Sequence, residues 1–209
     1  MIYGLTGASC AGKKTLGRQL SQKLGIPFIP IKITEIASEL GLPSTVDNLD
    51  FMERITVQYK ILCGMEVFLN DLTTPCIIDR TPIDLIAYML AEINMHSLTN
   101  TLEIIDSSLV EFYNSCIELT KEYVDRLYCL DYLPLYDLDT KRPPAGQAYQ
   151  LHRQLLIKGA MSQLTFHGVV AQCLSPDVSP EDRAEVIYKD ISEDMAKNVL
   201  VEAKFKTLN

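Results

Sequence analysis

The residues best suited to chemistry form a short segment bounded by two glycines, at 7–15. In order they are Gly7, Ala8, Ser9, Cys10, Ala11, Gly12, Lys13, Lys14 and Thr15. The glycines let successive backbone N–H groups turn toward one anion, and the lysine after the second glycine adds an ammonium. An apolar run at 2–6 precedes the segment, and leucines at helical spacing follow it over 13–24. This strand, loop and helix pattern predicts binding of the phosphates of ATP.

One position departs from the usual phosphate-binding pattern. That pattern ends in Gly-Lys-Ser/Thr, where the hydroxyl ligates magnesium, but Lys14 stands there and Thr15 comes one residue later. In one interpretation Thr15 reaches Mg²⁺ by a small shift or through water. In the others, Lys14 adds charge for a more anionic partner, or is a solvated lysine in the first turn of the helix.

A second candidate group follows the apolar run at 75–79, which ends in Asp79 and is followed by Arg80. Open parallel sheets bind ligands at the carboxyl ends of their strands. Asp79 is expected to hold magnesium through water or to accept a proton from an attacking hydroxyl, and Arg80 to clamp a phosphate. A structural ion pair is the alternative. Asp131, after the run at 124–130, ranks second because no arginine follows it directly.

Two further regions are candidates for substrate contact. Lys141 and Arg142 lie in a loop bounded by prolines, which predicts a lid over 134–153 that excludes water and brings a cation to the migrating phosphoryl group. Gln58 falls on the apolar stripe of a predicted helix, with Arg54 one turn earlier. A nucleobase edge could satisfy the Gln58 amide, with Arg54 beside a phosphate or carboxylate; a core glutamine with its own partners is the alternative.

The composition is that of an ordinary soluble protein, with 209 residues, 47% of them hydrophobic and 22% charged. The net charge of −8 argues against a broad grip on nucleic acid. A local basic groove is still compatible with it, from Lys13, Lys14, Arg18, Arg80, Lys141, Arg142 and Arg153. No segment has the length of a membrane span, so we expect a cytoplasmic protein with no membrane partner. The six cysteines lack metal-ligand spacing and mostly lie in apolar stretches, which predicts reduced core thiols, with the exception of Cys10 in the phosphate-binding loop.

Apolar runs alternate with helical patterns along the chain. The runs are at 2–6, 27–31, 75–79, 124–130 and 167–174, and the main helical patterns are at 13–24, 49–72, 100–122 and 147–163. This order predicts an α/β fold, a three-layer α/β/α arrangement around a parallel sheet of about five strands. We expect a single domain over 1–209, with an acceptor-binding helical region at 34–72 and the lid described above.

Together these segments resemble the P-loop AAA-type nucleotide kinase family, which includes phage deoxynucleoside monophosphate kinase-like proteins and ribosylnicotinamide kinase domains. The resemblance spans most of the chain and rests on 7–15, 34–41, Phe51 and Gln58, 79–88, and 139–142 with Tyr149 and Gln150. It implies that Gly7, Gly12 and Lys13 cradle ATP and that Thr15 or Asp79 serves magnesium. It further implies that Arg80 meets the acceptor phosphate and that Arg142 is the lid arginine.

The resulting expectation is an ATP-dependent phosphotransferase that acts on a (deoxy)nucleoside monophosphate. One alternative is a kinase of a nucleoside or of a hydroxymethylated base in DNA. Another is a nucleotide-dependent ATPase switch or binding protein. The expected partner is a small nucleotide or nucleoside acceptor, and a homodimer is left open.

Overall fold

The computed structural model describes residues 1–43, 49–93, 103–131, 147–166 and 168–207. Its strands are β1 (Ile2–Thr6), β2 (Phe28–Pro30), β3 (Cys76–Asp79), β4 (Arg126–Leu130) and β5 (Val170–Leu174). Its helices are α1 (Lys13–Leu24), α2 (Ile33–Glu39), α3 (Phe51–Asn70), α4 (Pro82–Ile93), α5 (Glu103–Tyr123), α6 (Gln147–Phe166) and α7 (Pro180–Thr207). Helices separate the successive strands, as predicted for an α/β protein.

The five strands form one parallel sheet in the order β2-β3-β1-β4-β5. The central strand β1 pairs with β3 on one side and with β4 on the other, so that Leu5 lies between Asp79 and Tyr128. The carboxyl ends of parallel strands meet at one edge of a sheet, where α/β proteins bind ligands. The loop after β1 and Asp79 at the end of β3 therefore come together at this edge.

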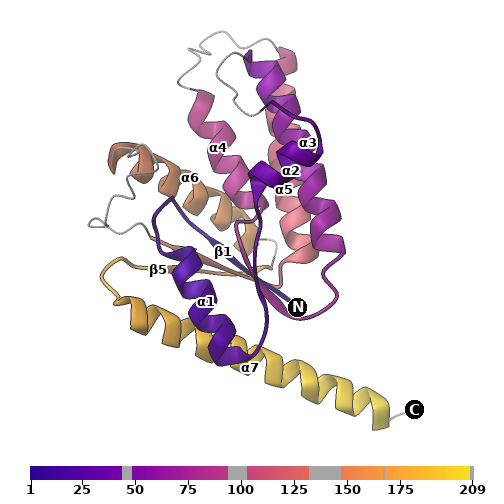
Figure 1. The fold of residues 1–209 in the computed structure, drawn as a ribbon, viewed down its shortest axis with the longest axis vertical. Helices are drawn as coiled ribbons and strands as arrows, with labels where there is room; N and C mark the ends of the chain where they lie inside the picture. Colours follow the sequence, from indigo (N-terminus) through magenta and orange to yellow (C-terminus); the bar gives the residue numbers. More distant parts are fainter. Residues whose placement is uncertain (44–48, 94–102, 132–146, 167, 208–209) are drawn as a thin grey trace.

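Each face of the sheet is covered by its own helices (Figure 1). On one face Tyr3 and Leu5 of β1 pack with apolar residues of α1 and α7. On the other face Ile2 joins a larger core built from α3, α4, α5 and α6. Because both faces are covered, β1 and β3 are buried along their whole length. The predicted three-layer α/β/α arrangement is confirmed.

The predicted element bounds agree with the structure to within a few residues. The strand over 2–6 and the helix over 13–24 are confirmed without change. The strand predicted over 75–79 begins at Cys76, because proline has no N–H to donate to the ladder. The last strand, predicted from 167, begins at Val170, after Gly168 with its positive φ of 84°.

A side-chain cap stabilises the start of α4, the helix that follows β3 at this edge of the sheet. The Asp84 carboxylate of α4 accepts hydrogen bonds from the Thr81 backbone N–H at 2.8 Å and from the Thr81 hydroxyl at 3.2 Å. A threonine before the helix, a proline at its first position and an acidic residue at its third are residue types typical of a helix start. A similar arrangement begins α7, where the Asp182 backbone N–H donates to the Ser179 hydroxyl at 3.1 Å.

Two further expectations concern the burial of the cysteine thiols and the presence of membrane-spanning helices. All six cysteines are free thiols, and three of them are buried: Cys76, Cys116 and Cys129. Cys10, which was excepted from the prediction of core thiols, is exposed, and so are Cys63 and Cys173, for which that prediction is wrong. Within the described residues, no helix has the length and apolar character needed to cross a membrane.

Candidate active site

The segment between β1 and α1 forms a tight loop whose backbone requires glycine at its start. Gly7 has φ of 137°, and a Cβ atom there would lie 2.3 Å from the carbonyl oxygen of Leu130. Gly12, with φ of 86°, turns the chain into the first turn of α1. A helix N-terminus presents free N–H groups and the positive end of the helix dipole. The loop is therefore built to face an anion.

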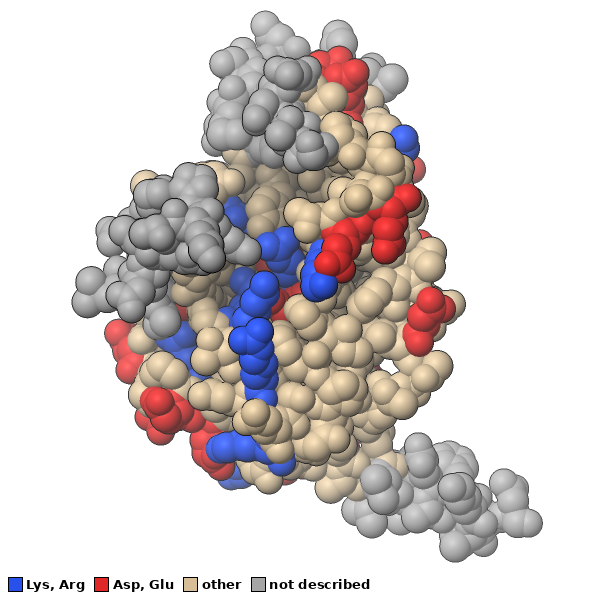
Figure 2. Space-filling view, in the orientation of Figure 1, with Lys and Arg blue, Asp and Glu red and all other residues tan. Residues whose placement is uncertain are grey.

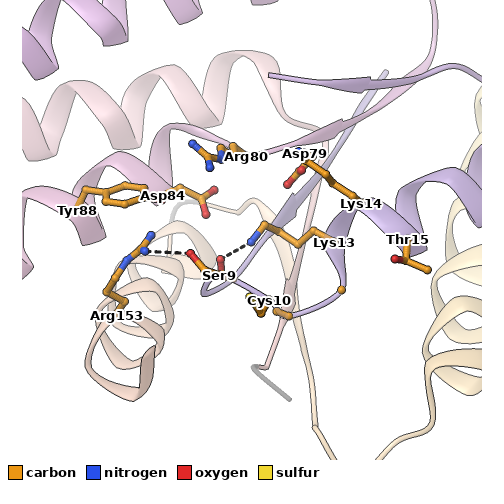
Figure 3. A pocket seen from close by; sticks show the side chains of 13 residues that line it. Ser9, Cys10, Lys13, Lys14, Thr15, Asp79, Arg80, Asp84, Tyr88 and Arg153 are labelled. Carbon is orange, nitrogen blue, oxygen red and sulfur yellow. Dashed lines mark hydrogen bonds between the residues drawn. The ribbon is translucent and has the colours of Figure 1, made fainter. Parts of the chain in front are cut away.

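Lys13 lies over the first half of this loop. Its ammonium donates hydrogen bonds to the carbonyl oxygens of Gly7 at 2.6 Å and of Ala8 at 2.9 Å. Figure 3 shows the Lys13 side chain directed back across the loop toward the centre of the site. The predicted ammonium thus lies where the loop would hold a phosphate.

The loop is supported from outside by α6. The side-chain oxygen of Gln154 accepts a hydrogen bond from the Ala8 N–H at 2.9 Å, and the Gln154 amide donates to Asp131 at 2.9 Å. Asp131 also pairs with Lys158 at 2.7 Å. Asp131, the second-ranked carboxylate of the sequence, does not line the cavity described next. Instead it orients the glutamine that holds the loop.

A cavity of about 320 Å³ opens in front of the loop. Its walls come from the loop and α1, the end of β3, α4 and α6, and its lining residues are Gly7, Ser9, Cys10, Ala11, Gly12, Lys13, Lys14, Thr15, Asp79, Arg80, Asp84, Tyr88 and Arg153. Figure 2 shows Lys and Arg side chains gathered around a hollow in the middle of this face. A protein of net charge −8 thus concentrates positive charge at one cavity.

Asp79 is buried at the floor of this cavity, with 3% of its surface exposed. Among the described residues, its Oδ1 atom has no hydrogen-bond partner. Burial raises the pKa of Asp79 above its usual range. The positive charge of Lys13 lowers this pKa in part, and the negative charge of the nearby Asp84 raises it further. A buried carboxylate with an unpartnered oxygen is suited to hold a hydrated cation or to accept a proton.

Arg80 has a strained backbone next to this carboxylate. Its φ of 75° lies in the left-handed region, which residues other than glycine seldom adopt. Its backbone N–H donates to the carbonyl oxygen of Leu5 at 3.1 Å, which ties the turn to β1. Strain of this kind costs on the order of 1–3 kcal/mol and clusters at functional sites. Here it directs the guanidinium of Arg80 into the cavity (Figure 3).

Two further predicted substrate residues, Arg54 and Gln58, do not line this cavity. Arg54 and Gln58 lie on α3, where Arg54 donates to the carbonyl oxygen of Leu49 at 3.1 Å. The Gln58 Oε1 atom is buried with no hydrogen-bond partner among the described residues. Lys141 and Arg142, with most of the predicted lid at 134–153, lie outside the described residues. The roles of these residues stay predictions.

The two residues predicted to serve magnesium differ in their surroundings. Thr15 is exposed, and Figure 3 shows its side chain apart from Asp79. Lys14 is also exposed and lines the cavity. The described residues contain no group of three or more acidic, His or Cys side chains able to hold a metal. Magnesium needs only one or two carboxylates when phosphate oxygens and water complete its shell. The unpartnered oxygen of Asp79 fits that requirement.

Arg153 and Tyr88 are site residues to which the sequence assigned no role of their own. Arg153 comes from the second turn of α6, far along the chain from the loop, and no local motif surrounds it. Of the basic groove expected from the sequence, the structure brings Lys13, Lys14, Arg80 and Arg153 to one cavity. The sequence had placed Arg153 in that groove because of its charge, and at the end of the predicted lid segment, without a specific role.

Replacing Asp79 with asparagine is expected to stabilise the protein and impair its chemistry. A raised pKa means that the folded state binds more protons, so stability falls as pH rises above the pKa of the unfolded chain. At about pH 7 the buried charge is unfavourable, and Asp79→Asn should gain about 1 kcal/mol, or about 2–4 °C in Tm. Thermal unfolding from about pH 4 to pH 8 checks this.

The gain should shrink toward acidic pH, where wild-type Asp79 is itself protonated. Asp71→Asn, at an exposed carboxylate, is the matched control and should change stability by less than about 0.5 kcal/mol. A loss of stability in Asp79→Asn at neutral pH would contradict the account of this residue.

Known proteins share this architecture. A family model described as an AAA domain matches residues 3–167. No curated protein matches the sequence. The fold is similar to that of deoxyadenosine kinase from M. mycoides with bound dCTP, with a TM-score of 0.62 and 16% identity over 92% of this chain and 100% of that chain. It is also similar to the YorR protein of Bacillus subtilis in complex with phosphorylated GDP. That TM-score is 0.55, at 15% identity over 94% of this chain and 98% of that one.

At these identities the solved structures establish the fold, and the family model covers most of the chain, from β1 to the end of α6. The family model also spans every element that lines the cavity. The glycine-bounded loop, the lysine that closes it and the acidic end of β3 agree with such a family. The chain belongs to the AAA-domain family of P-loop proteins, on a fold that it shares with deoxyadenosine kinase from M. mycoides.

Proposed function

We propose that this protein is an ATP-dependent phosphotransferase that acts on a (deoxy)nucleoside monophosphate. The observation that carries the proposal is the convergence of Lys13, Asp79 and Arg80 on one cavity in front of an anion-binding loop. Phosphoryl transfer requires positioning and charge neutralisation rather than covalent participation of the protein. These residues supply a cation for the donor, a carboxylate, and a second cation for the acceptor.

A second cavity suggests how the donor lies. It has a volume of about 140 Å³ and shares Ala11, Gly12 and Thr15 with the first cavity. The remaining lining residues are Leu16, Gln19, Leu130, Pro180 and Arg183. Apolar walls of this kind suit a purine ring. We place the base of ATP there, so that its phosphates run along the loop toward Lys13 and Asp79.

Magnesium enters the proposal as a partner of the donor phosphates. When bound, it neutralises charge on the phosphate oxygens. Asp79 is the residue that would hold it, through water, while Thr15 would contribute only after a shift of its side chain. Asp79 also orients the acceptor by accepting a hydrogen bond, and the buried floor of the cavity limits access of water.

The acceptor is assigned to the side of Arg80. The structurally similar proteins were solved with dCTP, dATP or phosphorylated GDP, which supports a nucleotide or nucleoside at this site. In the proposal Arg80 binds the acceptor phosphate, Gln58 and Arg54 contribute from the helical region at 34–72, and Arg142 belongs to the lid. The resemblance in fold to deoxyadenosine kinase makes a nucleoside acceptor the second candidate. The cytoplasmic location and the homodimer stay predictions.

The proposal is tested by acceptor-dependent formation of ADP. The protein is incubated with ATP, magnesium and a panel of nucleosides and nucleoside monophosphates. We expect Arg80→Ala to lower kcat/KM for the acceptor about 100-fold and to leave ATP affinity within about twofold. Arg18→Ala removes an exposed arginine of α1 outside the cavity and should match the wild type. ADP release that is independent of every acceptor would instead indicate an ATPase switch.

A further inference from the structure

Arg153 is a buried cation with no counter-ion among the described residues. Only 4% of its surface is exposed, and no described carboxylate lies within 4.0 Å of it. Its Nε atom is buried with no hydrogen-bond partner in the same part of the chain. A buried guanidinium is strongly unfavourable unless an anion or a hydrogen-bonding partner compensates it. The side chain therefore points to an anionic ligand.

The guanidinium of Arg153 is held at the loop by two aromatic rings and one hydroxyl group. It stacks on the ring of Tyr88, with 3.7 Å from its carbon to the ring centroid, and lies 5.7 Å from the ring of Tyr149. One of its terminal nitrogens donates to the Ser9 hydroxyl at 3.3 Å. Figure 3 shows Arg153 and Lys13 approaching Ser9 from opposite sides. Stacking on aromatic rings leaves the edge of a guanidinium free to bind phosphate oxygens.

The point at which Arg153 contacts the loop identifies the phosphate that it would bind. The second cavity, assigned above to the donor base, touches the loop at Ala11, Gly12 and Thr15. Arg153 touches the loop at Ser9, near the carbonyl oxygens of Gly7 and Ala8 that bind Lys13. A triphosphate that starts at the base cavity and follows the loop therefore ends at Arg153.

We propose that Arg153 binds the terminal phosphoryl group of the donor triphosphate, with Tyr88 as the residue that positions it. This inference rests on the proposed function and assigns a specific role to a residue that the sequence placed only within the expected basic groove and at the end of the predicted lid segment. During transfer an acceptor oxygen forms a bond to the γ-phosphorus. The bond from that phosphorus to the bridging oxygen breaks, and its electron pair leaves with ADP. Arg153 neutralises charge on the migrating group throughout this exchange.

The direct test compares the binding of ATP and ADP by calorimetry, without an acceptor and at one fixed magnesium concentration. We expect Arg153→Gln to weaken ATP binding about tenfold and to change ADP binding less than about twofold, because only ATP carries the terminal group. Arg153→Lys should lose less ATP affinity than Arg153→Gln. Arg18→Ala is the matched control. An equal loss for both nucleotides, or no loss for either, would overturn the assignment.

A second variant keeps the test readable if Arg153→Gln does not fold. Tyr88→Leu retains the guanidinium of Arg153 but removes its stacking partner. It should therefore also weaken the binding of ATP more than that of ADP, by a smaller factor than Arg153→Gln does. These binding measurements contain no acceptor, so their outcome does not depend on phosphoryl transfer. The proposed function fails separately, if the wild-type protein phosphorylates no acceptor. With an active wild type, kcat of Arg153→Gln should fall about 100-fold or more.

Discussion

Lys13→Ala is expected to lower the rate of phosphoryl transfer by about 1,000-fold. The Lys13 ammonium lies over the loop, 2.6 Å from the carbonyl oxygen of Gly7, and faces the cavity. Any phosphate held by the loop amides would approach it closely, in a site where water is partly excluded and charge interactions are strong. Removing one preorganised cation or donor from such a site costs about 100- to 1,000-fold in kcat.

The measurement is single-turnover transfer from ATP at saturating acceptor. Lys13→Arg keeps the charge but changes its shape, and should recover only part of the rate. Lys23→Ala is the matched control, because Lys23 lies on the same helix and forms an exposed ion pair with Glu185 at 2.8 Å. That variant should behave as the wild type. Unchanged transfer in Lys13→Ala would remove the loop from the mechanism.

Gly7→Ala is expected to destabilise the protein by about 3 kcal/mol or more, equivalent to about 6–12 °C in Tm. The new Cβ atom would lie 2.3 Å from the backbone oxygen of Leu130, in the neighbouring strand β4. Backbone atoms cannot move aside as a flexible side chain can. The strand and the loop would have to separate at the edge where the site is built.

Gly12→Ala provides the matched comparison within the same loop. Gly12 also has a positive φ, of 86°, but a Cβ atom there would meet nothing within 4 Å. Its cost should therefore be limited to backbone strain, about 1 kcal/mol. Thermal unfolding of both variants without nucleotide separates the two effects. Equal Tm values for Gly7→Ala and Gly12→Ala would show that the contact with Leu130 does not constrain the loop.

The sequence was sufficient for the features that depend on local chemistry. The loop over 7–15 was predictable because glycine and lysine at fixed spacing have few other uses between a strand and a helix. The sheet followed from apolar runs separated by helices, and Asp79 at its edge followed from the rule that parallel strands align their carboxyl ends. The cap at Asp84 was readable from Thr81 and Pro82.

Other features depend on long-range packing and carry no local signal. Arg153 contacts Ser9 of the loop, 144 positions away in the sequence. Its role is inferred from its burial and its stacking on Tyr88, and the spacing of residues along the sequence does not reveal either. Gln154 is equally silent in the sequence, although it links the Ala8 N–H to Asp131. Strand ends shifted by one to three residues where proline or glycine competes with the apolar pattern, as at Cys76 and Val170.

The central claim is that the loop after β1 binds the polyphosphate of ATP, and calorimetric titration of ATP into the wild-type protein with magnesium tests it most directly. The account predicts one saturable site per chain, with the heat of binding lost in Lys13→Ala although the variant stays folded. The absence of a saturable heat in the wild type, or an undiminished heat in Lys13→Ala, would contradict it.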